Sequence, residues 1–305
     1  MTKEEKMENS ILVSAIVTTY KRESVLVCRA VESILNQTYG NIEIIVVDDN
    51  KEEDKIKQNL KIEMLKYGEK VHYVEHEKNM GACAARNSGL KVAKGEFVAF
   101  LDDDDEWLPQ KIEKQLKKFN DEKVALVYCN YTFVHDKTGT KQHTKKPCYE
   151  GNIYDSLILT NYIGSTSFPL IRKKSIDAIG GFDLLMKSAQ DYDVWLRLSK
   201  QFEVKFVDES LGLYHIHEEE RISTNKQNKI DGVERLNQKN MEYLNNNKKA
   251  WRIRHVSLAK KYASAGDIKT AFGLWIRICF KDMFRPIENI KFFLSIGKEY
   301  MVSII

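Results

Sequence analysis

Short apolar runs alternate with segments of helical periodicity over the first hundred residues of the chain. The runs are rich in β-branched and aromatic residues, which favour buried strands, and they comprise Ile11–Val17, Ile42–Val47, Val71–Val74 and Glu96–Leu101. Between them lie segments expected to be helical, Glu23–Asn36, Glu52–Tyr67 and Gly81–Ala93. Strands that alternate with helices predict an α/β fold with a mostly parallel sheet between helical layers.

The pattern is less regular after Pro109, where shorter elements are expected. They are a helix to about Phe119, a strand at Ala125–Tyr131, a polar loop or hairpin over 134–150, a helix at Gly151–Asn161 and a strand at Ser167–Ile171. The segment Gln190–Lys200 is clearer, because its apolar residues repeat at helical spacing. It predicts an amphipathic helix with Val194, Trp195 and Leu198 facing the core.

Composition changes near residue 222, and from Asn225 onward the chain is polar and helical. We therefore predict two domains, residues 1–222 and a C-terminal helical extension of residues 223–305. Residues 263–267 are typical of a connection between two helices. In the helix expected at Ile268–Phe280, one face collects apolar residues, namely Ala271, Phe272, Trp275, Ile278 and Cys279.

The bulk composition is that of an ordinary globular protein, with 43% hydrophobic and 30% charged residues. The net charge of +4 is mild and does not predict a nucleic-acid partner. Five scattered cysteines without a CxxC pair suggest neither a zinc site nor a disulfide framework, and a reducing cytoplasm fits them best. The first ten residues lack the apolar core of a signal peptide, and no run reaches the ~18 apolar residues of a membrane-spanning helix.

Polar side chains collect where three of the predicted strands end. Thr18 and Tyr20 follow the first strand, Asp48 and Asp49 close the second, and Asp102–Asp105 follow the fourth. The carboxyl ends of parallel strands meet at one edge of a sheet, where ligands bind. We therefore expect these side chains to share one site.

Four consecutive aspartates, Asp102–Asp105, cannot all pack in a core, because the burial of unpaired charges is prohibitive. They form either a solvated acidic loop or a set of ligands, and their position directly after a buried strand favours ligands. A calcium EF-hand is disfavoured, because Trp107 stands at the loop position that requires glycine. Carboxylate oxygens suit Mg²⁺ or Mn²⁺ shared with a diphosphate.

Each of the other candidate site residues has both a structural and a functional interpretation. Asp49 would cap the next helix or bind a ligand, and Arg86 is either a surface residue or a partner for phosphate. Asp191 opens a helix, either as its cap or as a general base that accepts a proton from an acceptor hydroxyl. His215 and His217 lie on an alternating stretch that is typical of a strand. The chain contains no GxGxxG, Walker A or GxSxG sequence.

Several segments, in order along the chain, resemble glycosyltransferase family 2. They are VSAIVTTYKRE, ESILNQTYGNIEIIVVDDN, GACAARNSGLKVAKGEFVAFLDDDDEWLP, IGGFD and QDYDVWLRL. The resemblance covers roughly residues 11–223. It implies the Rossmann-like GT-A fold and the transfer of a sugar with inversion of the anomeric centre. It also implies a nucleotide-diphosphate sugar as donor, with UDP-sugars favoured, and Mn²⁺ or Mg²⁺ as cofactor.

The resemblance implies roles for residues at matching positions. Those for the nucleotide sugar are Thr18, Tyr20, Arg22, Asp49, Arg86, Asp102 and Asp103. Asp49 would read the edge of the base. Asp104 would be the direct metal ligand, joined by His217 near the diphosphate, and Asp191 would be the catalytic base. The chain departs from the family's common residues at Lys21 and His215, which leaves base preference and a phosphate contact from position 215 open.

The function that these features imply is that of a metal-dependent glycosyltransferase in cell-surface polysaccharide synthesis. Its acceptor would be a glycan or a lipid-linked glycan. The alternative is a catalytically silent protein that binds sugar nucleotides, and the retention of Asp191 argues against it. A nucleotidyltransferase would need a glycine-rich phosphate loop after the first strand, where the sequence reads TTYKRES.

Residues 268–305 combine aromatic with basic side chains. Such a segment is typical of a peripheral helix at the inner face of the cell membrane. The same pattern is typical of a helical hairpin that packs on the catalytic domain, and the sequence favours this alternative slightly. In either case we expect a cytoplasmic protein.

Overall fold

The computed structural model describes residues 11–217, 225–281 and 286–304, and the chain divides into two compact units. The first unit consists of Met1–Leu157, Asn161–Leu184 and Asp191–Glu218. The second consists of Ile158–Thr160, Leu185–Gln190 and Glu219–Ile305, so it includes two short segments that precede the boundary expected at residue 222. Residue 222 itself lies outside the described residues.

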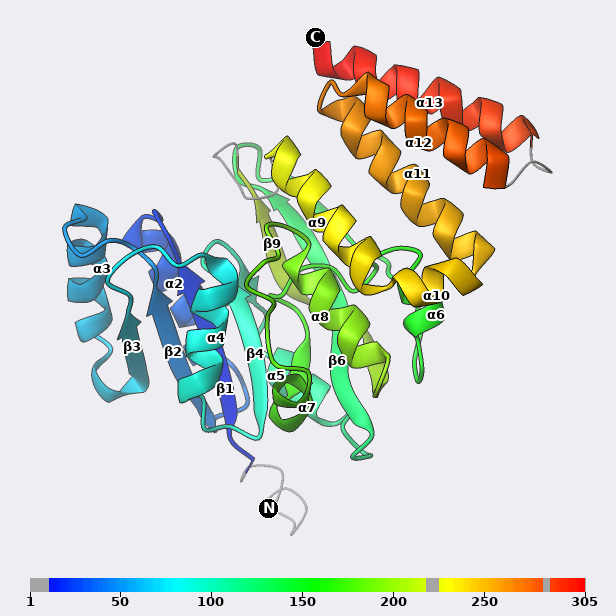
Figure 1. Cartoon of the computed structure of the whole chain (residues 1–305). Coiled ribbons are helices and arrows are strands. Elements are labelled where there is room, and N and C mark those ends of the chain that lie inside the picture. Colours follow the sequence, from blue (N-terminus) through cyan, green and yellow to red (C-terminus); the bar gives the residue numbers. More distant parts are fainter. Residues whose placement is uncertain (1–10, 218–224, 282–285, 305) are drawn as a thin grey trace. The chain divides into compact units, whose positions relative to one another are not determined.

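Four strands pair in parallel in the order β3-β2-β1-β4 and form one half of the sheet in the first unit (Figure 1). Their bounds are β1 Val13–Thr19, β2 Ile42–Asp48, β3 Val71–Glu75 and β4 Phe97–Asp102, so the four predicted strands are confirmed. Thr18 of β1 pairs with Val47 on one side and with Asp102 on the other. The carboxyl ends of β1, β2 and β4 therefore lie side by side.

The other half of the sheet is mixed. β8 pairs antiparallel with β4 and β6, β6 pairs parallel with β9, and β5 pairs antiparallel with β9. Their bounds are β5 Glu106–Trp107, β6 Val124–His135, β8 Leu170–Arg172 and β9 Glu203–Ile216. The short strand β7 (Lys141–His143) pairs antiparallel with β6, which confirms the hairpin expected over 134–150. The sheet is thus parallel only in part, since β8 and β5 run against their neighbours.

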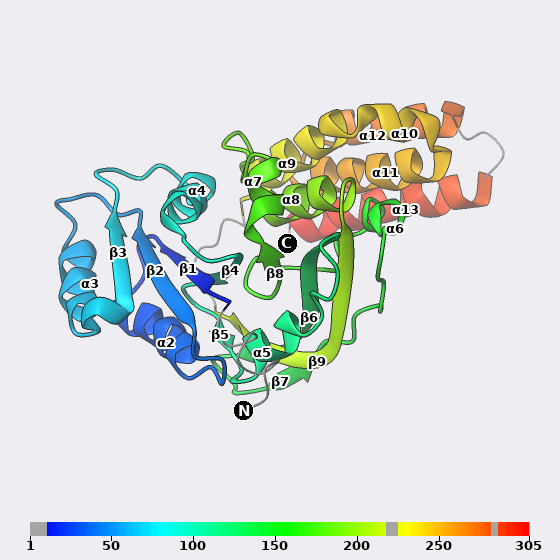
Figure 2. The ribbon, with the colours of Figure 1, turned by 90° about the horizontal axis from the view of Figure 1, so that it is seen from below.

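Helices cover both faces of the parallel half (Figure 2). On one face lie α2 (Ser24–Leu35), α3 (Lys55–Leu65) and α5 (Lys111–Leu116), whose apolar side chains share a core with Val13, Ala15 and Val17. The other face is covered by α4 (Ala82–Val92). Gly89 lets α4 come close to β1, because a Cβ at this position would lie 2.4 Å from Cγ2 of Ile16.

The segment Gly151–Asn161, expected to be a helix, forms only the single turn α6 (Tyr154–Leu157). Gly151 instead bridges to Val204, and its φ of 78° is a conformation that favours glycine. The short helix α7 (Lys173–Ala178) follows β8, and a 3-10 turn, η1 (Gly68–Lys70), precedes β3. The predicted amphipathic helix is α8 (Gln190–Ser199), and Val194, Trp195 and Leu198 are fully buried as expected.

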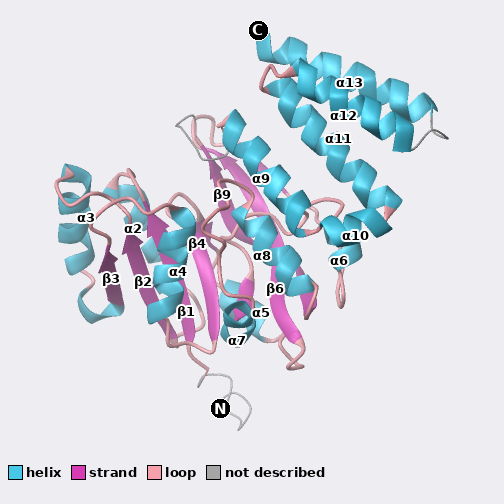
Figure 3. Cartoon of the chain, viewed as in Figure 1, coloured by secondary structure: helices cyan, strands magenta, loops and turns pink. Residues whose placement is uncertain are grey.

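The second unit is helical in its described residues from 225 onward (Figure 3). Its helices are α9 Lys226–Lys239, α10 Met241–Asn246, α11 Lys248–Ser264, α12 Ile268–Lys281 and α13 Pro286–Ile304. Residues 265–267 connect α11 to α12, as predicted. Ala271 and Ile278 are buried, but Phe272, which was expected on the same face, is 43% exposed. Among the described residues, none of the helices has both the length and the apolar character needed to cross a membrane.

Candidate active site

The acidic run leaves the carboxyl end of β4 and turns into β5, and its four carboxylates point to different partners. Asp102 ends β4, and Asp103, Asp104 and Asp105 follow in the turn. Asp103 and Asp105 are 7% and 1% exposed. The acidic run is therefore partly buried, and its carboxylates contact other side chains of the protein. The interpretation as a solvated loop is wrong.

Asp104 contacts His217 and Arg22. Its Oδ2 atom lies 2.6 Å from Nε2 of His217 and accepts a hydrogen bond of 3.1 Å from a terminal nitrogen of Arg22. Asp103 accepts a hydrogen bond of 3.1 Å from Nε of the same arginine. Burial raises the pKa of Asp103 to about 7, against the opposing effect of the Arg22 cation. The structure thus brings together both predicted metal ligands.

Asp102 forms an ion pair with Arg86, whose terminal nitrogen donates to it over 2.9 Å. The hydroxyls of Ser165 and Thr166 donate to the same carboxylate at 3.0 and 3.1 Å. Burial alone would raise the pKa of Asp102, but the Arg86 cation and these donors hold that pKa below its usual range. Asp102 is therefore a carboxylate that fixes Arg86 at the edge of the sheet.

Asp105 fastens the acidic run to β9. It accepts a hydrogen bond of 2.5 Å from the hydroxyl of Ser167 and one of 3.1 Å from the backbone N–H of His215. Burial raises the pKa of Asp105 well above its usual range. The ring of His215 lies between Asp136 and Glu106, at 2.5 and 2.8 Å, so His215 supports the strand.

Asp49 lies at the same edge, at the end of β2, and is 2% exposed. Its carboxylate accepts hydrogen bonds from the backbone N–H groups of Met80 and Gly81, at 2.7 and 2.9 Å. Nδ1 of His76 lies 2.7 Å from it. Asp49 therefore positions the start of α4. A nucleotide base that bound to Asp49 would have to share carboxylate oxygens that already accept hydrogen bonds from the protein.

Thr18 and Tyr20 complete the predicted nucleoside pocket. Thr18 is half-buried in β1, and Tyr20 is 40% exposed just after it. Between Tyr20 and Arg22, Lys21 has a φ of 53°, and its backbone N–H donates to Oδ1 of Asn50 over 2.7 Å. The turn that follows β1 is thus fixed to the turn that follows β2.

Asp191 opens α8 and is held by Asn161, whose Nδ2 donates to it over 3.2 Å. Burial raises the pKa of Asp191, and the charges of Arg86 and Asp102 act on it as well. Asp191 therefore lies near the Arg86–Asp102 pair. Asp191 is a partly buried carboxylate with a raised pKa, which suits a general base.

This arrangement of strands and side chains is shared with known proteins. The sequence profile of glycosyl transferase family 2 matches residues 14–180, which include Asp49, Arg86 and the acidic run. The chain belongs to this family.

Curated relatives of this family 2 chain extend the match. The putative colanic acid biosynthesis glycosyl transferase WcaA of Escherichia coli is 30% identical over 234 residues, which are 74% of this chain and 80% of the relative. An uncharacterized glycosyltransferase of Rickettsia felis is 32% identical over 226 residues, or 69% of this chain. The match spans only 35% of that longer relative.

Among solved structures, the family 2 chain is similar to S. aureus TarS 1-349 in complex with UDP-GlcNAc. The TM-score is 0.63 at 19% sequence identity, and the match covers 96% of this chain and 84% of that one. TarS 1-349 in complex with UDP gives a TM-score of 0.56 at 16% identity. This likeness confirms the GT-A fold class expected from the sequence.

Asp104 and His217 are the residues best placed to hold a divalent cation in this family 2 chain. Within the described residues, no group of three or more His, Cys, Asp or Glu side chains could hold a metal ion by itself. Two protein ligands nevertheless fit Mg²⁺ or Mn²⁺, because such ions are commonly bound through one or two side chains and the phosphates of a substrate. In the described part of the chain, Nδ1 of His217 is buried without a hydrogen-bond partner, so the imidazole ring is held through Nε2.

Sequence reasoning missed the supports of this family 2 site in residues 161–167. Ser165, Thr166 and Ser167 hold Asp102 and Asp105, and Asn161 holds Asp191. In the sequence these residues form a short polar run next to Gly164. The run has no periodicity that would indicate a functional site. Only the tertiary structure brings this run to the acidic residues.

Lys146 was also missed. Its Nζ donates to the carbonyl oxygens of Tyr162 and Ile163 at 2.6 and 2.7 Å and lies 4.4 Å from the ring centroid of Tyr131. Burial lowers the pKa of Lys146 to about 8. Lys146 thereby fixes the turn at Gly164, whose backbone N–H donates to Oδ1 of Asn161 over 3.0 Å.

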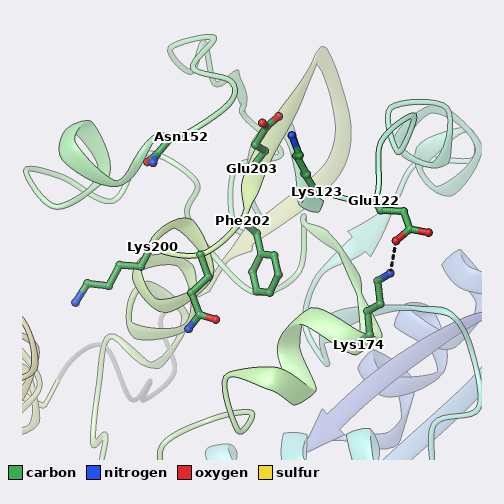
Figure 4. Close-up of a pocket in the computed structure, with 8 residues that line it drawn as sticks. Glu122, Lys123, Asn152, Lys174, Lys200, Phe202 and Glu203 are labelled. Atoms are coloured by element: carbon green, nitrogen blue, oxygen red, sulfur yellow. Dashed lines mark hydrogen bonds and ion pairs between the residues drawn. The ribbon is translucent and has the colours of Figure 1, made fainter.

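A separate pocket lies where β6 and β9 begin, away from the predicted residues (Figure 4). Its lining includes Phe202, Lys200 and an ion pair of 3.1 Å between Lys174 and Glu122. None of the predicted site residues lines it. The candidate active site of this family 2 chain is therefore the opposite edge, where the buried charged groups converge.

Proposed function

We propose that this chain is an inverting, metal-dependent glycosyltransferase that uses a nucleotide-diphosphate sugar. The observation that carries the proposal is that a pair of possible metal ligands and a possible general base lie at the same edge of the sheet. One is the Asp104–His217 pair, which suits a cation, and the other is Asp191, a partly buried carboxylate with a raised pKa that suits a proton acceptor. The Asp102–Arg86 pair lies near Asp191 and presents a guanidinium group to an anionic donor.

In the proposed reaction, Asp191 accepts the proton of an acceptor hydroxyl as that oxygen attacks the anomeric carbon of the donor. The bond from that carbon to the diphosphate breaks in the same displacement, so the configuration inverts. Arg86 and Arg22 would bind phosphate oxygens, and Asn161 would keep the carboxylate of Asp191 in position. A divalent cation held by Asp104 and His217 would neutralise charge on the leaving diphosphate.

The donor and pathway are proposed from the relatives. TarS 1-349 was solved with UDP-GlcNAc and with UDP, and WcaA is described as a glycosyl transferase of colanic acid biosynthesis. We propose a UDP-sugar donor and a glycan or lipid-linked glycan acceptor in cell-surface polysaccharide synthesis. The cytoplasm is the compartment that would supply such a donor.

The alternative is a sugar-nucleotide-binding protein without transferase activity, and turnover decides between the two. UDP-sugars are screened by thermal shift with Mn²⁺, and release of UDP is then followed with candidate glycan acceptors. The proposal expects stabilisation by a donor and acceptor-dependent release of UDP. Stabilisation without release under any acceptor would support the silent binder, and stabilisation by no nucleotide would contradict both.

We also propose that α12 and α13 contact an anionic membrane surface. Along α12, Phe272, Ile276 and Phe280 are 43, 37 and 78% exposed, and they recur at every fourth residue on one side of the helix. The helix carries three basic residues and no acidic one. An apolar stripe beside basic residues fits the interface of anionic lipids.

The helix α13 continues this surface. Ile290 and Leu294 are 59 and 65% exposed, and the ring of Phe293 lies 5.0 Å from that of Trp275 on α12. Lys291 and Lys298, also exposed, flank these apolar residues. The positive charge of the surface opposes self-association through it and favours an anionic partner.

Vesicle flotation with the intact chain tests this surface. We expect binding to anionic vesicles, little binding to zwitterionic ones, and about tenfold weaker binding for Phe280→Ser. Leu65→Ser is the matched control, because Leu65 on α3 is 72% exposed and lies in the first unit. Equal flotation of the Phe280→Ser variant and the wild type would contradict the proposal. So would a dimer in sedimentation that Phe280→Ser dissociates, since the surface would then bind a second copy.

A further inference from the structure

The guanidinium group of Arg22 lies between the carboxylates where a metal ion would bind. It makes contacts of 3.1 Å with both Asp103 and Asp104, and a third nitrogen lies 3.4 Å from Nε2 of His217. The Arg22 side chain is only 14% exposed. A cationic group thus already contacts both predicted metal ligands.

The backbone holds Arg22 in this place. Lys21, directly before it, has a φ of 53°, a conformation that residues other than glycine seldom adopt. The backbone N–H of Lys21 is fixed by the side chain of Asn50 at the end of β2. Two neighbouring strand ends therefore position the backbone that leads into Arg22.

The two cations compete for one oxygen atom. Oδ2 of Asp104 accepts from Arg22 and lies 2.6 Å from His217, so a metal that took the place of this His217 contact would meet an oxygen that Arg22 already engages. A divalent ion at that oxygen would stand within a few ångströms of the guanidinium group, and like charges at such a distance repel strongly in a partly buried site. We therefore expect Arg22 to move away from Asp104 when the metal binds.

We propose that Arg22 is the resident counter-ion of the acidic run, and that the metal enters only together with the donor. This inference rests on the proposed metal-dependent transfer. Without a donor, Arg22 neutralises Asp103 and Asp104 and keeps the affinity for metal low. When the donor arrives, its diphosphate offers oxygens that bind a guanidinium group as well as carboxylates do, so Arg22 transfers to the diphosphate and Asp104 is released to the metal.

Binding of Mn²⁺ in the absence of any sugar donor tests the proposal, with free Mn²⁺ measured by electron paramagnetic resonance. We expect weak binding to the wild type and about tenfold tighter binding to Arg22→Gln. Asp104→Asn added to Arg22→Gln should return the affinity to the weak wild-type level, because Asp104 is then no longer a charged ligand. Unchanged or weaker Mn²⁺ binding by Arg22→Gln would overturn the proposal.

Arg29→Gln is the matched control. Arg29 donates to the backbone oxygen of Asp104 over 2.8 Å and lies 3.5 Å from Glu106, so it is a nearby cation that does not contact the Asp104 carboxylate. Its removal should change Mn²⁺ affinity by no more than about twofold. An equal gain for Arg29→Gln and Arg22→Gln would show a general effect of charge and would refute a specific role of Arg22.

Addition of UDP separates this inference from the proposed function. In the wild type, UDP should tighten Mn²⁺ binding about tenfold, and in Arg22→Gln this coupling should shrink, because Asp104 is already free. Tight binding of Mn²⁺ by the wild type without UDP would refute the role of Arg22 and leave metal-dependent transfer intact. If neither protein binds Mn²⁺ with UDP present, the proposed metal dependence fails, and the inference fails with it.

Discussion

The two edges of the sheet differ in how far their charged side chains are buried. One is the carboxyl edge, where β1, β2 and β4 end, and the other is the edge where β6 and β9 begin. Where β1, β2 and β4 end, Asp49, Asp103 and Asp105 are 2, 7 and 1% exposed, and each has assigned partners. Where β6 and β9 begin, Lys174 and Glu122 form an ion pair whose side chains are 60 and 86% exposed. The second edge has the open pocket of Figure 4, and the first has the buried charges.

The difference in burial between the two edges indicates which edge is the site of catalysis. An exposed ion pair contributes little to stability, and its side chains remain solvated. A buried carboxylate is destabilising unless hydrogen bonds and opposite charges compensate for lost solvation, and such groups with shifted pKa values are typical of functional sites. The carboxyl edge is therefore the better candidate, although the open pocket lies at the other.

The largest effect is expected at Asp191. Asp191→Asn keeps the shape of the side chain but removes the group that accepts the proton, so turnover should fall by about 10²–10⁴-fold while donor affinity is unchanged. Steady-state kinetics and calorimetric titration of the donor measure the two quantities. Asp177→Asn, on an exposed part of α7, is the control and should behave as the wild type. Wild-type turnover of Asp191→Asn would remove Asp191 from the mechanism.

A smaller effect is expected at Lys146, which acts through Asn161. Lys146→Met frees the turn at 162–164 that holds Asn161, and we expect kcat to fall about tenfold with little change in the KM of the donor. The loss of a nearby positive charge should also raise the pKa of Asp191, so the acidic limb of the kcat profile should move to higher pH. The exposed neighbour Lys145 provides the matched control, Lys145→Met. A fall in kcat without any movement of this limb would contradict the charge interaction between Lys146 and Asp191.

The pH dependence of the wild type follows from the raised pKa of Asp191. Asp191 accepts a proton only when it is ionised, so turnover should fall as the pH drops through its raised pKa. The half-maximal point of kcat on the acidic side should therefore lie above about 4, the usual value of an aspartate. A profile that stays flat down to that pH would contradict the assignment.

The smallest effect is expected at the opposite edge. Lys123→Gln and Lys174→Gln change exposed side chains that line the pocket of Figure 4. We expect kcat and the KM of the donor to change by no more than about twofold. A tenfold rise in KM would show that this pocket takes part in donor binding and would contradict the assignment of the donor site to the edge where β1, β2 and β4 end.

The sequence predicted the carboxyl edge well because two simple patterns locate it. Buried strands appear as apolar runs, and the polar residues directly after those runs must meet at one edge of a parallel sheet. Asp49 and the acidic run are found there. Resemblance to the family added Asp104 and His217, which lie 2.6 Å apart although 113 residues separate them.

The remaining features could not be predicted, because they depend on tertiary contacts. Ser165 and Lys146 act on residues far away in the sequence, and nothing in their local pattern points to those partners. The helix expected at Gly151–Asn161 gave way to a bridge with Val204, since pairing with β9 outweighed local preference. The contact of Arg22 with Asp104 likewise depends on how two strand ends are arranged.

The central claim is that the donor and its metal bind at the edge formed by Asp104, His217 and Arg86. Crystals grown with UDP and Mn²⁺ and measured at the manganese absorption edge test it most directly. We expect one strong anomalous peak in contact with the Asp104 carboxylate, with the diphosphate of UDP bound between this peak and Arg86. A peak away from Asp104, or UDP bound in the pocket beside Lys174 and Glu122, would contradict it.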